Sequence, residues 1–171
     1  GVTGPDEYQI LVNNNAYTNL MARENLRFAS EIVTWLQQAD TTAYQALAQK
    51  ITIQEDEPAV WKKAAENMYI PYDEERGIIP QDDAFLSKAV WDFEGTPKEN
   101  YPLLLHYHPL VVTRYQVCKQ ADLVLGEFLL HDQFDHAQKL RDYNYYERIT
   151  THDSSLSGGI FGIMAAELGD V

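Results

Sequence analysis

The feature that most constrains the fold is a run of apolar residues at helical spacing between Asn13 and Gln38. Its apolar members are Met21, Phe28, Ile32 and Trp35. This spacing places side chains along one face of an α-helix, and one of the asparagines at positions 13–15 can cap the first turn. The sequence therefore predicts one long amphipathic helix over residues 13–38.

Shorter helical patterns follow, separated by long irregular stretches. The predicted helices cover residues 41–50, 57–68, 109–131, 134–146 and a last segment from Ser155 to Gly169. Residues 70–80 alternate around a polar turn, which predicts a short β-hairpin or an extended loop. The fold class predicted from these patterns is all-α, and the length of the chain suits one domain over residues 1–171.

The charge balance limits the partners that the protein can bind. The chain carries 26 acidic and 13 basic residues, which gives a formal net charge of -13. This surplus of negative charge argues against nucleic acid or an anionic membrane as a partner, although it leaves room for one local basic site. No apolar run approaches the length of a membrane span.

The single cysteine, Cys118, excludes a disulfide within the chain. One thiol fits a reducing compartment, and we expect a cytoplasmic location. Cys118 falls inside the predicted helix 109–131, where a packing role is more common than nucleophilic catalysis.

Glu7 is the first candidate for catalysis. It lies in a Gly-Pro-Asp-Glu-Tyr turn just before the long helix, and such a turn can present a carboxyl group to a cleft. In a dry cleft, burial raises the pKa of a carboxyl group, which can then donate a proton to a leaving oxygen. A solvated carboxylate is the more common role for an acidic turn residue on spacing alone.

Lys119 and Gln120 are the second candidates, on the predicted helix 109–131 and directly after Cys118. A lysine that faces inward can bind a sugar hydroxyl or a phosphate oxygen. The alternative is a lysine whose aliphatic stem covers the helix flank while its amine reaches water, and the sequence by itself favours that alternative.

The third candidate is the segment 150–159, in which hydroxyl-bearing residues and glycines precede the last helix. Free backbone amides and the helix dipole favour an anion at such a position, and His152, Ser154 and Ser155 can add donors. An ordinary N-cap by Asp153 or Ser154 is the alternative. The number of small donors in a row makes this segment the best indication of a phosphate or sulfate site.

Other kinds of site find no support in the sequence. His106 and His108 are followed by Pro109, so they do not form a helical metal-binding pair, and we predict no metal. Neither of the glycine-rich phosphate loops of nucleotide-binding proteins occurs, and we predict no organic cofactor.

Four motifs in the same order resemble glycoside hydrolase family 65, the inverting α-glucoside phosphorylases. They are Gly1-Val2-Thr3-Gly4-Pro5-Asp6-Glu7-Tyr8, Asn13-Asn14-Asn15-Ala16-Tyr17-Thr18-Asn19, Lys119-Gln120-Ala121-Asp122 and Thr151-His152-Asp153-Ser154-Ser155-Leu156-Ser157. The resemblance implies that the chain is the carboxy-terminal portion of an (α/α)6 catalytic barrel. It also implies an amino-terminal β-sandwich, an earlier barrel segment and a carboxy-terminal β-domain outside this chain.

The resemblance assigns roles to the candidate residues. Glu7 corresponds to the general acid, Lys119 and Gln120 to substrate-binding residues, and the set His152, Ser154 and Ser155 to the phosphate site. Inorganic phosphate is then the nucleophile and co-substrate, so one acid replaces the acid and base pair of an inverting hydrolase.

The implied reaction is phosphorolysis of an α-glucosyl disaccharide to β-glucose 1-phosphate and a free sugar. We expect maltose as the substrate, with kojibiose, nigerose and trehalose still open, and a parent enzyme that is a homodimer. A family-related hydrolase that uses water is the alternative activity. A non-catalytic helical fragment is the alternative for the isolated chain, which we expect to be inactive.

Overall fold

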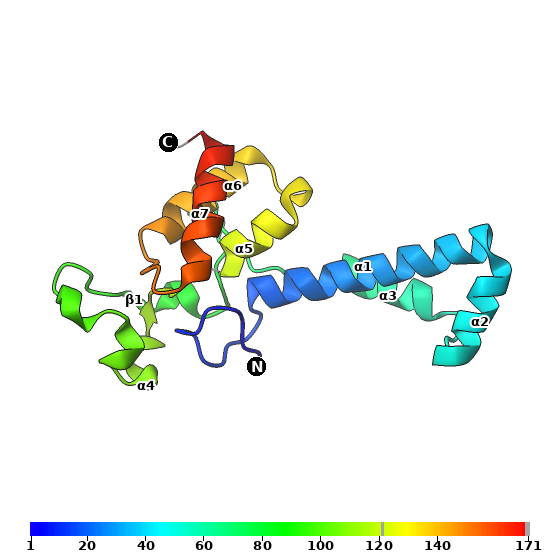
Figure 1. Cartoon of the computed structure of the whole chain (residues 1–171), viewed down its shortest axis with the longest axis horizontal. Coiled ribbons are helices and arrows are strands. Elements are labelled where there is room, and N and C mark those ends of the chain that lie inside the picture. The colour runs from blue at the N-terminus through cyan, green and yellow to red at the C-terminus, as the bar shows by residue number, and fades with distance from the viewer. Residues whose placement is uncertain (121, 170–171) are drawn as a thin grey trace. The chain divides into compact units, whose positions relative to one another are not determined.

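The structure is a computed structural model that describes residues 1–120 and 122–169 (Figure 1). It divides into two compact units, one formed by Gly1–Thr18 with Ile70–Val171 and the other by Asn19–Tyr69. The α-helices of the described residues are α1 (Ala16–Ala39), α2 (Thr41–Ile51), α3 (Glu57–Glu66), α4 (Pro109–Val112), α5 (Asp122–Leu129), α6 (His136–Glu147) and α7 (Ser155–Leu168). The strands are β1 (Ala89–Val90) and β2 (Tyr115–Gln116).

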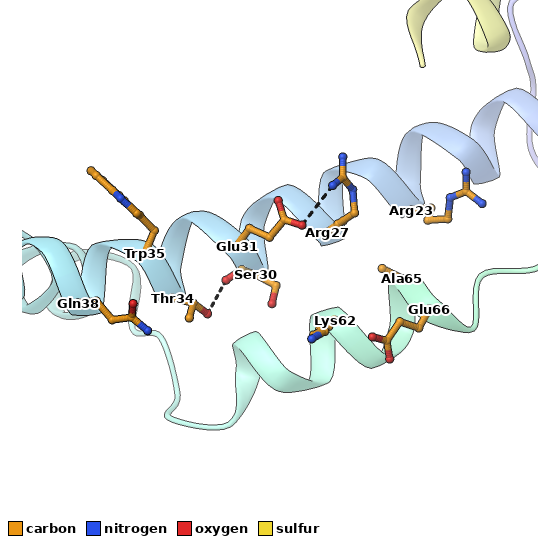
Figure 2. A pocket seen from close by; sticks show the side chains of 10 residues that line it. All are labelled: Arg23, Arg27, Ser30, Glu31, Thr34, Trp35, Gln38, Lys62, Ala65 and Glu66. Carbon is orange, nitrogen blue, oxygen red and sulfur yellow. Dashed lines mark hydrogen bonds and ion pairs between the residues drawn. The ribbon is translucent and has the colours of Figure 1, made fainter. Parts of the chain in front are cut away.

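The unit Asn19–Tyr69 contains most of the long helix that the sequence predicts. Asp40 caps α2 by accepting a hydrogen bond from the amide of Ala43 at 2.9 Å, and Pro58 lies in the first turn of α3. Ser30 of α1 donates to the carbonyl of Pro58 at 2.8 Å, which attaches α1 to α3. The two helices flank a groove of about 530 Å³ (Figure 2).

The apolar face predicted for α1 is only partly buried. Phe28 and Trp35 are each 59% exposed, and Ile32 is 41% exposed, whereas Val33 on another face is buried. The helix was therefore predicted correctly, and its apolar face is only partly covered within this unit. The reason is that α1 contacts α3 through the side that carries Ser30.

In the other unit, α5, α6 and α7 pack against one another (Figure 1). Their buried residues include Leu123, Val124, Tyr143, Tyr146, Phe161 and Met164. Asp135 caps α6 through the amide of Gln138, and Gly169 ends α7 with a φ of 77°, a left-handed conformation that glycine adopts at low cost. None of the helices in the described residues is long and apolar enough to cross a membrane.

The predicted helix 109–131 is wrong. Helix α4 ends at Val112, and the chain then extends into β2, which pairs in parallel with β1. The side-chain amide of Gln9 donates to the carbonyls of Tyr115 and Val117 at 3.2 and 3.3 Å, so a distant residue satisfies backbone groups that a helix would have paired. The all-α prediction therefore missed a small parallel sheet, and Cys118 lies in a bridge to Thr150 and not in a helix.

The predicted hairpin near residues 70–80 is confirmed as a single antiparallel bridge between Asp73 and Ile78. The amide of Asp73 donates to the carbonyl of Ile78 at 2.9 Å, and Gly77 adopts a φ of 67° in the turn. The Asp73 carboxylate also accepts from the amide of Arg76 at 2.7 Å, a side-chain contact that stabilises the turn.

The buried side chain of Glu127 in α5 leads us to expect that the stability of the fold depends on pH. Neither oxygen of this side chain is hydrogen-bonded within the described residues. Burial, together with the neighbouring Asp142 charge, raises the pKa of Glu127 from 4.5 to about 9. The folded state therefore keeps a proton that the unfolded chain releases, so the free energy of unfolding falls as the pH rises through this window.

We expect Glu127→Gln to raise the Tm near neutral pH and to have little effect below pH 4.5, where both folded and unfolded chains are protonated at this position. Thermal unfolding followed by circular dichroism across the pH window measures this, with the exposed Glu94→Gln as the control. A Tm difference that does not change with pH would contradict it.

Candidate active site

The turn around Glu7 directs Asp6 and Tyr8 into the interior and Glu7 toward solvent. Asp6 and Tyr8 are buried, whereas the side chain of Glu7 is 59% exposed. The Asp6 carboxylate accepts hydrogen bonds from the amides of Tyr8 at 3.1 Å and Lys119 at 2.9 Å. Asp6 therefore joins the turn that carries Glu7 to the loop that carries Lys119.

The structure brings the first two groups of predicted site residues together. The Lys119 amine forms an ion pair with the Glu7 carboxylate, and the Gln120 amide donates to the carbonyl of Pro5 at 2.9 Å. Lys119 and Gln120 lie in a bend before α5 and not on the predicted helix, and Ala121 of the same motif lies outside the described residues. The Glu7 carboxylate is exposed, which agrees with the solvated position that spacing alone favours over a dry cleft.

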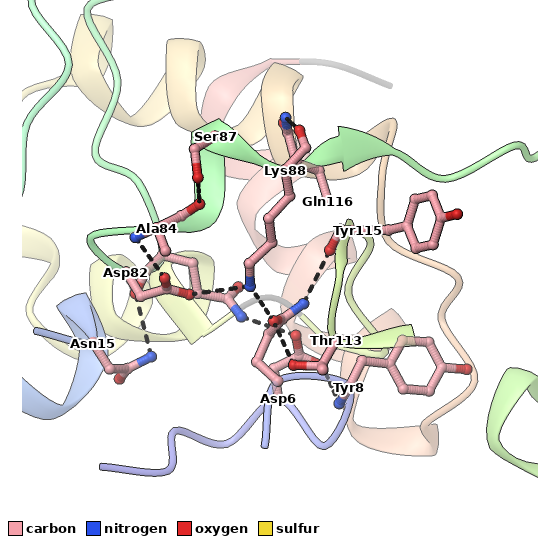
Figure 3. A network of polar contacts seen from close by, with 12 residues as sticks. Asp6, Tyr8, Asn15, Asp82, Ala84, Ser87, Lys88, Thr113, Tyr115 and Gln116 are labelled. Atoms are coloured by element: carbon pink, nitrogen blue, oxygen red, sulfur yellow. Dashed lines mark hydrogen bonds and ion pairs between the residues drawn. The ribbon is translucent and has the colours of Figure 1, made fainter. Parts of the chain in front are cut away.

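A buried polar network connects this turn to other segments of the unit (Figure 3). The amide of Asp6 donates to Asp122 at 2.5 Å, Asn15 donates to the other Asp122 oxygen at 2.7 Å, and Gln81 donates to Asp6 at 2.8 Å. Burial raises the pKa of Asp6 to about 6, and burial with the nearby Asp6 charge raises that of Asp122 to about 8. These buried carboxyl groups hold the site together without facing solvent.

The same network continues to a lysine that the sequence analysis did not single out (Figure 3). The Lys88 amine donates to the side chain of Gln9 at 2.6 Å and lies 4.0 Å from the buried Asp82 carboxylate. Burial lowers the pKa of Lys88, and burial raises that of Asp82. No local motif marks Gln9, Gln81, Asp82 or Lys88, because their contacts join segments far apart in the sequence.

The third predicted group lies at the start of α7. Ser154 caps the helix by accepting from the amide of Leu156 at 3.3 Å, which is the N-cap alternative that the sequence left open. Ser155 is the first residue of α7 and is exposed. His152 has a φ of 55°, and its Nδ1 lies 2.9 Å from the hydroxyl of Ser157. Burial lowers the pKa of His152.

This third group is connected to the first two by hydrogen bonds of the backbone and of side chains. The amide of Thr151 donates to the carbonyl of Cys118 at 2.8 Å, one residue before Lys119. The Tyr8 hydroxyl donates to the carboxylate of Asp153, which lies between His152 and Ser154. All the predicted site residues therefore belong to one unit, tied together around the turn at Glu7.

A cavity of about 190 Å³ lies between the turn and α7. Its lining comes from the turn, the bend after Lys119 and the helices α5 and α7: Pro5, Gln120, Leu125, Leu156, Ser157, Ile160 and Phe161. Within the described residues, histidine, cysteine and acidic side chains form no group able to hold a metal ion. The chemistry that the site offers is thus a carboxyl group, an amine, an amide and the free donors at a helix start.

The chain is mostly helical, and comparison with known proteins identifies its family. The pattern of the glycosyl hydrolase family 65 central catalytic domain matches residues 1–171. The α,α-trehalose phosphorylases of Geobacillus stearothermophilus and Thermoanaerobacter brockii are 58% and 50% identical to the chain over 99% and 98% of its length. A solved structure named "Putative kojibiose phosphorylase from human microbiome" matches 99% of the chain with a TM-score of 0.87 and 33% identity.

The chain therefore belongs to glycosyl hydrolase family 65, as the motifs had indicated, and corresponds to part of the central catalytic domain. It spans 22% of the length of each of the two trehalose phosphorylases and 23% of the solved structure. The names of these relatives concern trehalose and kojibiose, and so they do not support the maltose specificity that we expected.

Proposed function

We propose that this chain is the part of an inverting disaccharide phosphorylase that carries the general acid and the phosphate segment, and that the enzyme acts on α,α-trehalose. The observation that carries the proposal is the joining of Glu7, Lys119 and the segment 152–155 in one unit. The 58% identity to an α,α-trehalose phosphorylase supports trehalose over maltose. Kojibiose is the second candidate, because the solved relative with the similar fold is named for it.

In the proposed reaction, Glu7 donates its proton to the oxygen that links the two glucose units. A phosphate oxygen attacks the anomeric carbon from the opposite face, and the bond from that carbon to the leaving oxygen breaks. The products are β-glucose 1-phosphate and glucose. Because phosphate is already an anionic nucleophile, the reaction needs no second carboxyl group as a base.

Lys119 exchanges partners during this cycle. Without substrate, its amine pairs with the Glu7 carboxylate. When substrate binds, the amine donates to a sugar or phosphate oxygen, and Gln120 contributes its amide to the same binding site. Glu7 is thereby released from its ion pair, takes up a proton and approaches the glycosidic oxygen.

Phosphate binds where the segment 152–155 enters α7. The positive end of the helix dipole favours an anion there. His152 and the hydroxyls of Ser154 and Ser155 supply additional hydrogen-bond donors, since a hydroxyl that accepts a bond as a cap can still donate its proton. Inorganic phosphate is the co-substrate, and we propose no other cofactor.

The remaining parts of the proposal concern the longer protein. The chain spans 22% of the length of its trehalose phosphorylase relatives, and the resemblance of its motifs supports a place in the carboxy-terminal part of an (α/α)6 barrel. An amino-terminal β-sandwich, the earlier barrel and a carboxy-terminal β-domain complete the enzyme, which forms a homodimer in the cytoplasm. The isolated chain has no activity, since much of the sugar site lies in those segments.

Initial rates with trehalose, kojibiose, nigerose and maltose, each with and without phosphate, test this proposal on the full-length enzyme. We expect turnover that depends on phosphate, with trehalose giving the highest kcat/KM. Turnover of a disaccharide in the absence of phosphate would instead support the family-related hydrolase. A preference for kojibiose would keep the phosphorylase and change its substrate.

A further inference from the structure

Tyr8 links the acid turn to the phosphate segment through the interior of the unit. Its side chain is 1% exposed and lies in a core cluster with Trp91, Leu103, Val112 and Val117. Its hydroxyl accepts a hydrogen bond from the amide of Leu103 at 3.0 Å and donates its own proton to Asp153. Burial raises the pKa of Tyr8, so the hydroxyl remains a donor throughout the physiological range.

Asp153 lies at the point where the phosphate segment changes direction. The residue before it, His152, adopts the left-handed conformation with a φ of 55°, and the residue after it, Ser154, caps α7. One Asp153 oxygen receives the Tyr8 hydroxyl and lies 3.4 Å from the amide of Leu103. The Asp153 carboxylate therefore joins His152 and the start of α7 to Tyr8, the residue next to Glu7, through a hydrogen bond.

We propose that Tyr8 and Asp153 are positioning residues whose hydrogen bond fixes the phosphate segment 152–155 relative to Glu7. This inference rests on the proposed phosphorylase function. In-line attack needs phosphate on one face of the sugar while the acid is on the other, and this geometry tolerates only small displacements. The Tyr8 ring is buried and packed, so it serves as a spacer between the acid that protonates the glycosidic oxygen and the segment that holds the attacking phosphate.

Tyr8→Phe in the full-length enzyme removes the hydroxyl and leaves the packed ring. Because a buried hydrogen bond to a charged group is lost, we expect the KM for phosphate to rise about tenfold and the KM for trehalose to change less than about twofold. Tyr145→Phe is the matched control, since its half-buried hydroxyl donates to Gln116, which belongs to neither segment. Asp153→Ala removes the acceptor and gives the same test from the partly exposed partner if Tyr8→Phe lowers the Tm.

The double variant separates positioning from general loss of structure. If the two residues act through one hydrogen bond, Tyr8→Phe/Asp153→Ala should raise the KM for phosphate no more than the worse single variant does. Additive effects, or equal rises in both KM values, would overturn the inference while phosphate-dependent turnover persists. Wild-type turnover without phosphate would overturn the proposed function itself, and the inference with it.

Discussion

Glu7→Gln in the full-length enzyme should lower kcat for trehalose phosphorolysis by about 10²- to 10⁴-fold, the contribution typical of a positioned general acid. Glutamine has nearly the same size as glutamate, but it cannot act as the acid that protonates the departing glycosidic oxygen. The substitution also removes the charge that Lys119 pairs with. Because Lys119 then stays available to the substrate, substrate binding should be retained. Steady-state rates with saturating phosphate measure the effect.

A substrate with a good leaving group distinguishes loss of the acid from loss of the fold. α-Glucosyl fluoride needs little proton donation as its fluoride departs, so Glu7→Gln should react with it and phosphate at a rate close to that of the wild type. Glu75→Gln, an exposed change in the turn between Asp73 and Ile78, is the control and should leave both reactions unchanged. Wild-type rates on trehalose for Glu7→Gln would remove Glu7 from the mechanism.

Gly4→Ala should disable the enzyme although it adds one methyl group. A Cβ atom at Gly4 would lie 1.9 Å from the Asp122 carboxylate and 2.6 Å from the Asn15 amide. Neither group can retreat easily, because Asp122 accepts from Asp6 and Asn15 accepts from Thr18 at 2.9 Å. We expect a loss of stability of about 1–3 kcal/mol from this overpacking.

The activity of Gly4→Ala should fall further than its stability alone explains, because the turn that carries Glu7 must shift. A displacement of about 1 Å in a reacting geometry can cost about 10²-fold in rate. Gly162→Ala is the matched control, since a Cβ there meets nothing within 4 Å and alanine suits a helix interior. Tm and kcat/KM measured for both variants show whether the activity of Gly4→Ala falls further than its stability. An unchanged kcat/KM for Gly4→Ala would contradict the structure of the turn.

The helices were predictable where periodicity and local capping agree. The long helix, α2 and α3 follow from apolar spacing together with Asp40 and Pro58, all of which act within a few residues. The helix predicted over residues 109–131 failed because Gln9, more than a hundred residues away, supplies hydrogen bonds to Tyr115 and Val117. Such tertiary contacts leave no periodic signal, and the parallel pairing of β1 with β2 leaves none either.

In the candidate site, too, residues in local motifs could be predicted and residues held by long-range contacts could not. Glu7, Lys119 and the segment before α7 each occur in a recognisable local motif, so the sequence could locate them. The buried residues that hold these motifs together, such as Gln81 and Lys88, make their contacts across the fold and could not be found from spacing. The exposure of Glu7 agrees with the solvated role that spacing alone favours for an acidic turn residue.

The identity of the sugar product tests the central claim most directly. The full-length enzyme is incubated with α,α-trehalose and inorganic phosphate, and the first product is followed by phosphorus and proton NMR before its anomers interconvert or react further. The account predicts β-glucose 1-phosphate and free glucose in equal amounts, with no reaction when phosphate is omitted. Free glucose alone, formed at the same rate without phosphate, would contradict phosphorolysis and remove His152, Ser154 and Ser155 from the proposed phosphate site.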